Sequence, residues 1–138
     1  MAEQIEYSVN LESPIAVYVQ VENQIQFAVA SNRLKPGDTL PSVREISFIL
    51  GVNPNTITKA YRDLELLEVV NTRRGVGVAI TEKAPAICKE KTVEMVQRHL
   101  EEAVAECIAT GLGIKEIDEI VTNAVKSGVR PYVPEPMA

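Results

Sequence analysis

The chain has 138 residues, which is the length of one ordinary domain or of one small domain with an appendage, so a large multidomain enzyme is excluded. Hydrophobic residues make up 46%, charged residues 24% and aromatic residues 4%, a composition typical of a folded globular chain rather than a disordered or collagen-like one. No run of about 18 apolar residues is present, and the acidic start lacks the basic region of a signal peptide. We therefore expect a soluble, cytoplasmic protein with no membrane partner.

The net charge of -5 is unevenly distributed, and its distribution matters more than its sum. Residues 1–13 carry three acids and no base (-3), residues 14–80 carry seven bases and six acids (+1), and residues 81–138 carry seven bases and ten acids (-3). The middle segment alone is not acidic. An interaction with nucleic acid therefore stays open for that segment.

The first predicted element is an amphipathic helix that starts after Ser13 and Pro14. Residues 1–13 before it are predicted to form an extended, polar N-terminal extension. Pro36 and Gly37 favour a turn and end the helical pattern. Apolar side chains at intervals of three and four residues share one face of the helix. They are Tyr18, Val21, Ile25, Ala28 and Val29.

A second, short helix is predicted to begin at Ser42. Ser42 and Glu45 have the spacing of a capping box, in which each side chain accepts a backbone N–H at the helix start. Gly51 is suited to follow the last turn, because glycine adopts the left-handed conformation at low cost. The buried side of this helix is expected to consist of Ile46, Ile49 and Leu50.

A third helix follows after a single intervening residue, Val52. Asn53 is a good N-cap, and Pro54 suits the first helical position, where no amide hydrogen is needed. The helix has two faces with the same periodicity. The apolar face consists of Ile57, Ala60, Tyr61 and Leu64, and the polar face consists of Asn55, Thr58, Lys59 and Arg62.

Two β-rich runs at residues 68–72 and 76–81 flank Arg73, Arg74 and Gly75 and predict a hairpin with two arginines near its tip. Two helices joined by a tight glycine turn and followed by such a hairpin describe a winged helix-turn-helix, predicted here over residues 14–81. A helix fits the major groove of DNA, where Asn and Thr can read bases and Lys and Arg can hold phosphates. The alternative is a winged-helix protein-interaction module without DNA binding, whose polar face is merely solvated.

Beyond Pro85 the pattern predicts a long helix, a break at residues 111–113, and a shorter helix that ends near Gly128. Residues 131–138 are expected to form an irregular tail. The two helices form a hairpin with more apolar surface than they can hide between themselves, so a second copy of the chain is expected to cover it. Residues 82–130 are therefore the predicted dimerisation region. Its contacts are expected from Val93, Val96, Leu100, Ala103, Cys107, Ile114, Ile117 and Val121.

The order and spacing of several motifs resemble the DNA-binding domain of the GntR family of bacterial transcription regulators. The resemblance covers about residues 14–80. Its motifs are Pro14-Ile15 with Tyr18 and Gln20, the run 34–45, the run 51–57 with residues 59–61, 64 and 65, and the run 73–77. The short C-terminal part is similar to the YtrA-type branch, which implies a helical pair for dimerisation. Members of that branch are typically repressors, often of operons for ATP-binding-cassette transporters.

The resemblance implies that Arg44, the first part of the third helix and the hairpin around Gly77 contact DNA. Many members have an arginine where this chain has Pro54, and proline cannot make the guanine contact that arginine makes. A dimer would bind a pseudo-palindromic operator with half-sites about 10 base pairs apart. We expect release in response to a small-molecule effector that the sequence does not identify. The expected DNA contacts are Arg44, Asn53, Asn55, Thr56, Thr58, Lys59, Arg62, Arg73, Arg74, Gly75 and Gly77.

The chain offers few residues for metal binding or catalysis. Cys88 and His99 fall on nearly one helix face but about 16 Å apart along the axis, too far to share one ion. With Cys107, they are expected to have packing or surface roles, in a reducing compartment and without a metal or cofactor. One histidine gives no nucleophile and base pair, so we expect no enzyme activity. A metal-binding or enzyme-accessory helical protein is the remaining alternative.

Overall fold

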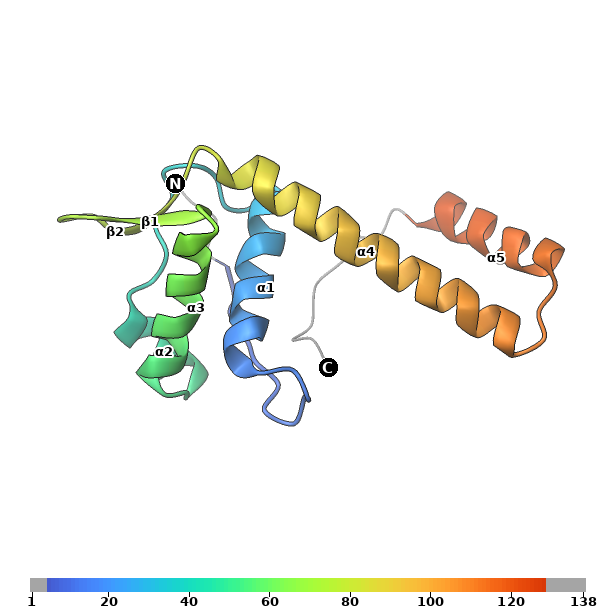
Figure 1. Cartoon of the computed structure of the whole chain (residues 1–138), viewed down its shortest axis with the longest axis horizontal. Coiled ribbons are helices and arrows are strands. Elements are labelled where there is room, and N and C mark those ends of the chain that lie inside the picture. The colour runs from blue at the N-terminus through green and yellow to red at the C-terminus, as the bar shows by residue number, and fades with distance from the viewer. Residues whose placement is uncertain (1–4, 129–138) are drawn as a thin grey trace. The chain divides into compact units, whose positions relative to one another are not determined.

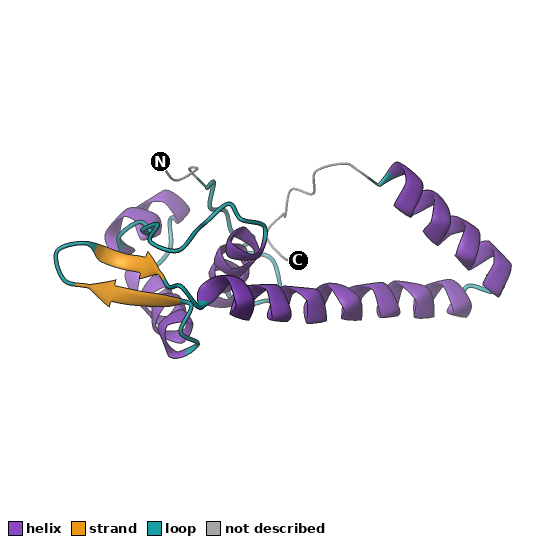
Figure 2. Ribbon diagram, turned by 90° about the horizontal axis from the view of Figure 1, so that it is seen from above, coloured by secondary structure: helices purple, strands orange, loops and turns teal. Residues whose placement is uncertain are grey.

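The structure is a computed structural model that describes residues 5–128, and within them it has five helices and one two-stranded sheet (Figure 1). Figure 2 shows the mainly helical composition and the small hairpin, which confirms the predicted fold class. The expected tail at residues 131–138 lies outside the described residues. The helices are α1 (Val17–Ala30), α2 (Val43–Leu50), α3 (Pro54–Leu66), α4 (Ala84–Ala109) and α5 (Ile114–Ser127), and the strands are β1 (Val70–Arg73) and β2 (Gly77–Ile80).

The chain divides into two compact units, one that runs through Thr92 and one that starts at Val93. In the first unit, α3 packs against both α1 and α2. The apolar faces predicted for the first and third helices meet in its core, as expected from their periodicity. The first turns of α4 complete this core through Ala84 and Cys88. The fully buried side chains include Val21, Ile25, Val29, Ile46, Ile57, Leu64, Val69, Val70 and Ile80.

The ends of α2 and α3 have the predicted caps. The backbone N–H of Glu45 donates to Ser42 Oγ at 3.1 Å, and the N–H of Ser42 donates to Glu45 Oε1 at 3.3 Å, which is a complete capping box. Gly51 adopts a φ of +66° after α2. The side chain of Asn53 accepts the backbone N–H of Asn55 at 2.8 Å and caps α3. Local residue chemistry therefore sets the tight turn between the two helices.

The prediction for the buried side of α2 was wrong at Ile49, whose side chain is 62% exposed. The buried face of α2 runs from Ile46 through the half-buried Leu50 to Ser47. Ser47 is therefore buried in place of Ile49. The hydroxyl of Ser47 donates to the backbone carbonyl of Arg44 at 3.0 Å, so its burial leaves no unpaired donor. A helix of only eight residues has too few turns for its periodicity to fix the centre of the buried arc.

The hairpin pairs β1 and β2 antiparallel, from Val70 opposite Ile80 to Arg73 opposite Gly77. The loop between α1 and α2 adds hydrogen bonds to the other edge of β2. In this loop the N–H of Leu40 donates to the carbonyl of Val78 at 2.8 Å, and the carbonyl of Asp38 accepts from Ile80 at 2.8 Å. These bonds anchor the base of the hairpin to the core, while its turn remains exposed.

Residues 5–10, which belong to the predicted N-terminal extension, form no helix or strand and pack on the core of the first unit through the partly buried Ile5, Tyr7 and Val9. The buried side chain of Gln20 holds this segment: Gln20 Oε1 accepts the N–H of Asn10 at 2.8 Å, and Gln20 Nε2 donates to the carbonyl of Asn10 at 3.0 Å. One helical turn later, Gln24 bonds the backbone of Ser8 in the same two-sided way. The side-chain amides of these two glutamines therefore satisfy the backbone N–H and C=O groups of Asn10 and Ser8, as a paired strand would.

In the second unit, α5 turns away from the end of α4 after residues 111–113, as Figures 1 and 2 show. Because the two helices diverge, most of their apolar side chains stay exposed, and Ile117 is a buried exception. Along the part of the chain that the structure describes, no helix has the length and hydropathy to cross a membrane. The exposed apolar residues of this unit are Val93, Val96, Leu100, Ile108, Ile114, Ile120, Val121 and Val125.

Candidate nucleic-acid interface

The polar face of α3 is exposed along the helix. At about 100° per residue, the side chains of Asn55 and Arg62 lie opposite the buried Ile57 and Leu64. Thr58 and Lys59 flank them and are also exposed. The predicted division of α3 into a core face and a solvent face is confirmed.

Hydrogen bonds within the first turn of α3 limit what each side chain can offer a ligand. Asn53 Oδ1 is used by the helix cap, so only its NH2 group is left to donate. Thr58 Oγ1 donates to the carbonyl of Pro54 at 3.1 Å, so its hydroxyl proton is engaged. For Asn55, the described residues provide no side-chain hydrogen bond. Its complete amide group is therefore available at the surface.

Lys59 lies between a carboxylate and an aromatic ring. Its Nζ is 3.2 Å from Oδ2 of Asp63, one turn along α3, and 4.9 Å from the centre of the Tyr18 ring on α1. The contact with Tyr18 directs the ammonium group toward α1, and the ion pair with Asp63 holds it along α3. Lys59 can therefore reach a phosphate beside the helix only by exchanging these contacts.

Beside this lysine, two carboxyl groups from α1 and α3 interact. Burial, together with a hydrogen bond to Asp63, raises the pKa of Glu22 to about 8. The hydrogen bond with Glu22 and the one with Lys59 lower the pKa of Asp63. Glu22 Oε1 is buried and has no hydrogen-bond partner in the described chain. At neutral pH these opposite pKa shifts favour a protonated Glu22 beside an ionised Asp63, whose negative charge faces Lys59.

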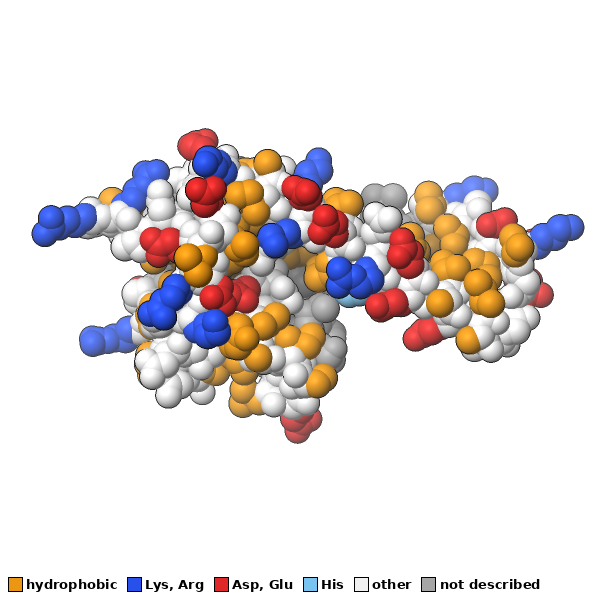
Figure 3. Space-filling view, in the orientation of Figure 1, with side chains coloured by type: hydrophobic (Ala, Val, Ile, Leu, Met, Phe, Trp, Pro, Cys, Tyr) orange, Lys and Arg blue, Asp and Glu red, His pale blue; other side chains and the backbone are white. Residues whose placement is uncertain are grey.

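Two further groups of basic residues flank α3. Arg44 is exposed in the first turn of α2, and Arg73 and Arg74 are exposed at the turn of the hairpin. Gly75 and Gly77 have φ values of +79° and +104°. The tight turn requires these values, and residues other than glycine rarely adopt them. Figure 3 shows Lys and Arg side chains over the hairpin and over α2 and α3. Such a surface suits a polyanion.

The structure brings the predicted DNA-contact residues together in the first unit, where all of them are exposed except the partly buried Thr56. Reasoning from the sequence missed Tyr18, Glu22 and Asp63 around Lys59. The spacing of Lys59 and Asp63, four residues apart on one helix, was the one available signal. Nothing in the sequence pairs Glu22 with Asp63, because they come from different helices.

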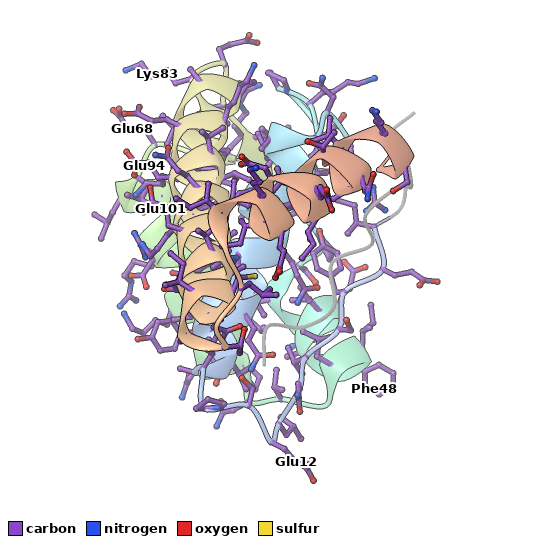
Figure 4. All side chains as sticks on the ribbon, turned by 90° about the vertical axis from the view of Figure 1, so that its right-hand side faces the viewer. Glu12, Phe48, Glu68, Lys83, Glu94 and Glu101 are labelled. Atoms are coloured by element: carbon purple, nitrogen blue, oxygen red, sulfur yellow. The ribbon has the colours of Figure 1, made fainter. Side chains whose placement is uncertain are left out.

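The predicted dimerisation residues differ in how exposed their side chains are. Val93, Val96, Leu100, Ala103, Ile114 and Val121 are exposed, Cys107 is half-buried, and Ile117 is buried. Glu94 and Glu101 of α4 are exposed and are labelled in Figure 4. In the first unit, Glu68 and Lys83, which are also labelled in Figure 4, form an exposed ion pair with Lys83 Nζ 3.5 Å from Glu68 Oε2.

The two cysteines and the histidine of α4 have different surroundings. Cys88 is buried, and burial raises the pKa of its thiol to about 11, so it is held as a neutral thiol. Cys107 is half-buried and His99 is exposed. Between residues 5 and 128, no three His, Cys, Asp or Glu side chains are grouped so that they could hold a metal ion.

Comparison with known proteins gives consistent matches. Residues 17–80 match the family described as bacterial regulatory proteins, gntR family. The chain is 34% identical to the HTH-type transcriptional repressor YtrA of Bacillus subtilis (strain 168) over 107 residues, which are 78% of this chain and 82% of that protein. It is 37% identical to the uncharacterized HTH-type transcriptional regulator YhcF of the same strain, over 85% of this chain and 96% of that protein.

The fold has matching counterparts among solved structures. A transcriptional regulator from Oenococcus oeni superposes with a TM-score of 0.70 at 32% identity, covering 85% of this chain and 97% of that one. Homologues of this kind are transcription regulators rather than enzymes. The polar face of α3, the capped turn before it and the arginine-tipped hairpin are thus those of a winged helix-turn-helix, and the chain belongs to the gntR family of bacterial regulatory proteins, as a YtrA-type transcription regulator with a DNA-binding domain.

Proposed function

We propose that this protein is a homodimeric transcription repressor that binds a pseudo-palindromic operator. One observation carries the proposal: the exposed polar face of α3 lies opposite a buried apolar face and is flanked by Arg44, Arg73 and Arg74. A helix held in this way can enter a major groove without unfolding its own core.

The side chains divide by the part of the duplex that each suits. Asn55, Thr56 and Thr58, at the start of α3, are proposed to face base edges. Arg44, Asn53, Lys59 and Arg62 are proposed to hold phosphates on either side, because charged and amide donors bind phosphate oxygens without regard to sequence. Arg73, Arg74, Gly75 and Gly77 are proposed to form a wing in the minor groove, whose negative potential attracts arginine.

The exposed apolar side chains of α4 and α5 support the proposed dimer. Val96 and Leu100 are each at least half exposed, although they lie at helical spacing on one stripe. Ile114 at the start of α5 is 79% exposed. A soluble chain seldom leaves so many large apolar side chains in water, so a second copy placed on this region would stabilise both chains.

Repression, the target operon and the effector are proposed by similarity. The relative from Bacillus subtilis is named a repressor, and a dimer that occupies a promoter blocks it sterically. We propose a transporter-type operon as the target, by analogy with the YtrA-type branch. A small-molecule effector would act by favouring one of two dimer geometries with different distances between the α3 helices.

Selection from a random duplex library with the full-length chain tests this proposal. We expect enrichment of two inverted half-sites, with centres about one helical turn or a multiple of it apart. Arg44→Ala should weaken binding to the enriched duplex, whereas Lys115→Ala, which removes an exposed charge on α5, should bind like the unchanged chain. A chain that enriches no motif and binds no duplex would instead support the protein-interaction alternative.

A further inference from the structure

The geometry points to an adenine-reading role for Asn55, so that each operator half-site carries an A·T pair where the first turn of α3 faces the major groove. This inference rests on the proposed function, because it assumes that α3 enters the groove. It adds the base that is read, which family membership leaves open at Pro54.

Asn55 has the chemistry that adenine requires. In the major groove, adenine presents the N7 acceptor beside the N6 donor, and an asparagine amide can pair with both at once. The amide of Asn55 is exposed, points away from the core, and has both its carbonyl and its NH2 free of other bonds in the described structure. Asn53 cannot do the same, because its carbonyl oxygen is occupied by the backbone N–H of Asn55 at 2.8 Å.

The neighbouring side chains do not suit guanine. Guanine presents two acceptors, O6 and N7, and is best read by two donors on one long basic side chain. Pro54 has no donor, and the hydroxyl proton of Thr58 is used by the Pro54 carbonyl at 3.1 Å. Lys59 is held by Asp63 at 3.2 Å and by the ring of Tyr18. A guanine contact at this turn would require Lys59 to leave both partners.

The same side chains favour the thymine opposite that adenine. With its hydroxyl engaged, Thr58 presents its methyl group, and Pro54 presents an exposed apolar ring. Apolar contact with the thymine methyl is the corresponding recognition mode. Arg62 is seven residues beyond Asn55, about 10 Å along the axis, and so is placed for the backbone rather than for this base pair. The first turn therefore combines an amide for adenine with apolar groups for thymine.

The experiment compares base preferences of the full-length chain, Asn55→Ala, Asn55→Gln and Asn55→Arg, with Asn123→Ala as a control for an exposed asparagine on α5. Each protein is taken through the same random-duplex selection. In Asn55→Ala we expect the preference for adenine to disappear at one position of each half-site and to remain at the others. Asn55→Gln should retain adenine at that position, and Asn55→Arg should shift it to guanine. Asn123→Ala should enrich the original motif.

A second measurement tests the contact itself. Replacing that adenine by 7-deazaadenine removes the N7 acceptor, and should weaken binding of the unchanged chain by roughly 5-fold or more, the lower end expected for a bidentate contact. Asn55→Ala should bind the two duplexes equally, which closes a double-mutant cycle. Because the Asn55 side chain supports no other group, its variants should unfold at the same urea concentration as the unchanged chain.

The outcomes separate the two proposals. If the unchanged chain enriches no motif, the proposed function itself fails. If it enriches a motif but Asn55→Ala keeps every base preference, or the lost preference is for a base other than adenine, DNA binding stands and the role assigned to Asn55 is overturned.

Discussion

Asn53 combines two roles that substitution can separate. Its Oδ1 caps α3 by accepting the N–H of Asn55 at 2.8 Å, and its NH2 group is proposed to donate to a phosphate. Alanine at this position removes both functions. Aspartate keeps the cap acceptor but replaces the donor with a negative charge. The two variants should therefore differ in stability and agree in the loss of DNA affinity.

The structure sets the expected magnitudes. Loss of an N-cap costs about 1 kcal/mol, so Asn53→Ala should lower the free energy of unfolding by about that amount and Tm by about 4–8 °C. Aspartate is as good an N-cap as asparagine, and a negative charge at the start of a helix adds roughly 0.3–1 kcal/mol. Asn53→Asp should therefore be at least as stable as the unchanged chain. Its DNA affinity should be the lowest of the three, because its carboxylate repels phosphates.

Urea denaturation followed by circular dichroism gives the stabilities, and fluorescence anisotropy with the selected duplex gives the affinities. Asn123→Ala serves as the control for both measurements, since Asn123 is exposed on α5. If Asn53→Asp binds DNA as tightly as the unchanged chain, Asn53 does not face a phosphate. An Asn53→Ala variant of unchanged stability would show that the cap contributes nothing.

Three more predictions follow from single residues. Gly51→Ala should lower the free energy of unfolding by about 1–2 kcal/mol in urea denaturation, because φ is +66° and an added Cβ would have no neighbour within 4 Å to contact in compensation. The pKa of Glu22 is about 8 in the folded chain and 4.5 in the unfolded chain. Protonated Glu22 therefore contributes to the free energy of unfolding at low pH, and this contribution is lost as the pH rises from 4.5 through 8. Denaturation between pH 4 and 9 should show this loss for the unchanged chain and a smaller one for Glu22→Gln. Equal pH profiles would contradict the raised pKa of Glu22. Leu100→Glu should convert the proposed dimer to a monomer in sedimentation equilibrium, and an unchanged mass would remove Leu100 from the interface.

The features that the sequence predicted well are local ones. The capping box at Ser42, the left-handed Gly51 and the Asn53 cap depend on residues within one or two turns, so their spacing is sufficient to identify them. The two faces of α3 were also predictable, because this helix is long enough for its periodicity to define a direction.

The features that were missed depend on contacts between distant segments. The burial of Gln20, which bonds the backbone of Asn10, and the pairing of residues 38–40 with β2 need the folded chain to bring them together. The same is true of Glu22 and Asp63, which lie on different helices and whose interaction changes the surroundings of Lys59. Apart from the four-residue spacing of Lys59 and Asp63, no local pattern distinguishes such residues from ordinary surface residues.

The salt dependence of operator binding tests most directly whether α3 and the hairpin hold a duplex. If each protomer neutralises about four phosphates, a plot of log affinity against log salt concentration should have a slope of roughly -7, which is -0.9 for each of eight contacts. An anisotropy titration of the full-length chain with its selected duplex over a range of salt concentrations measures this slope. A slope near zero, or no binding at low salt, would contradict the account.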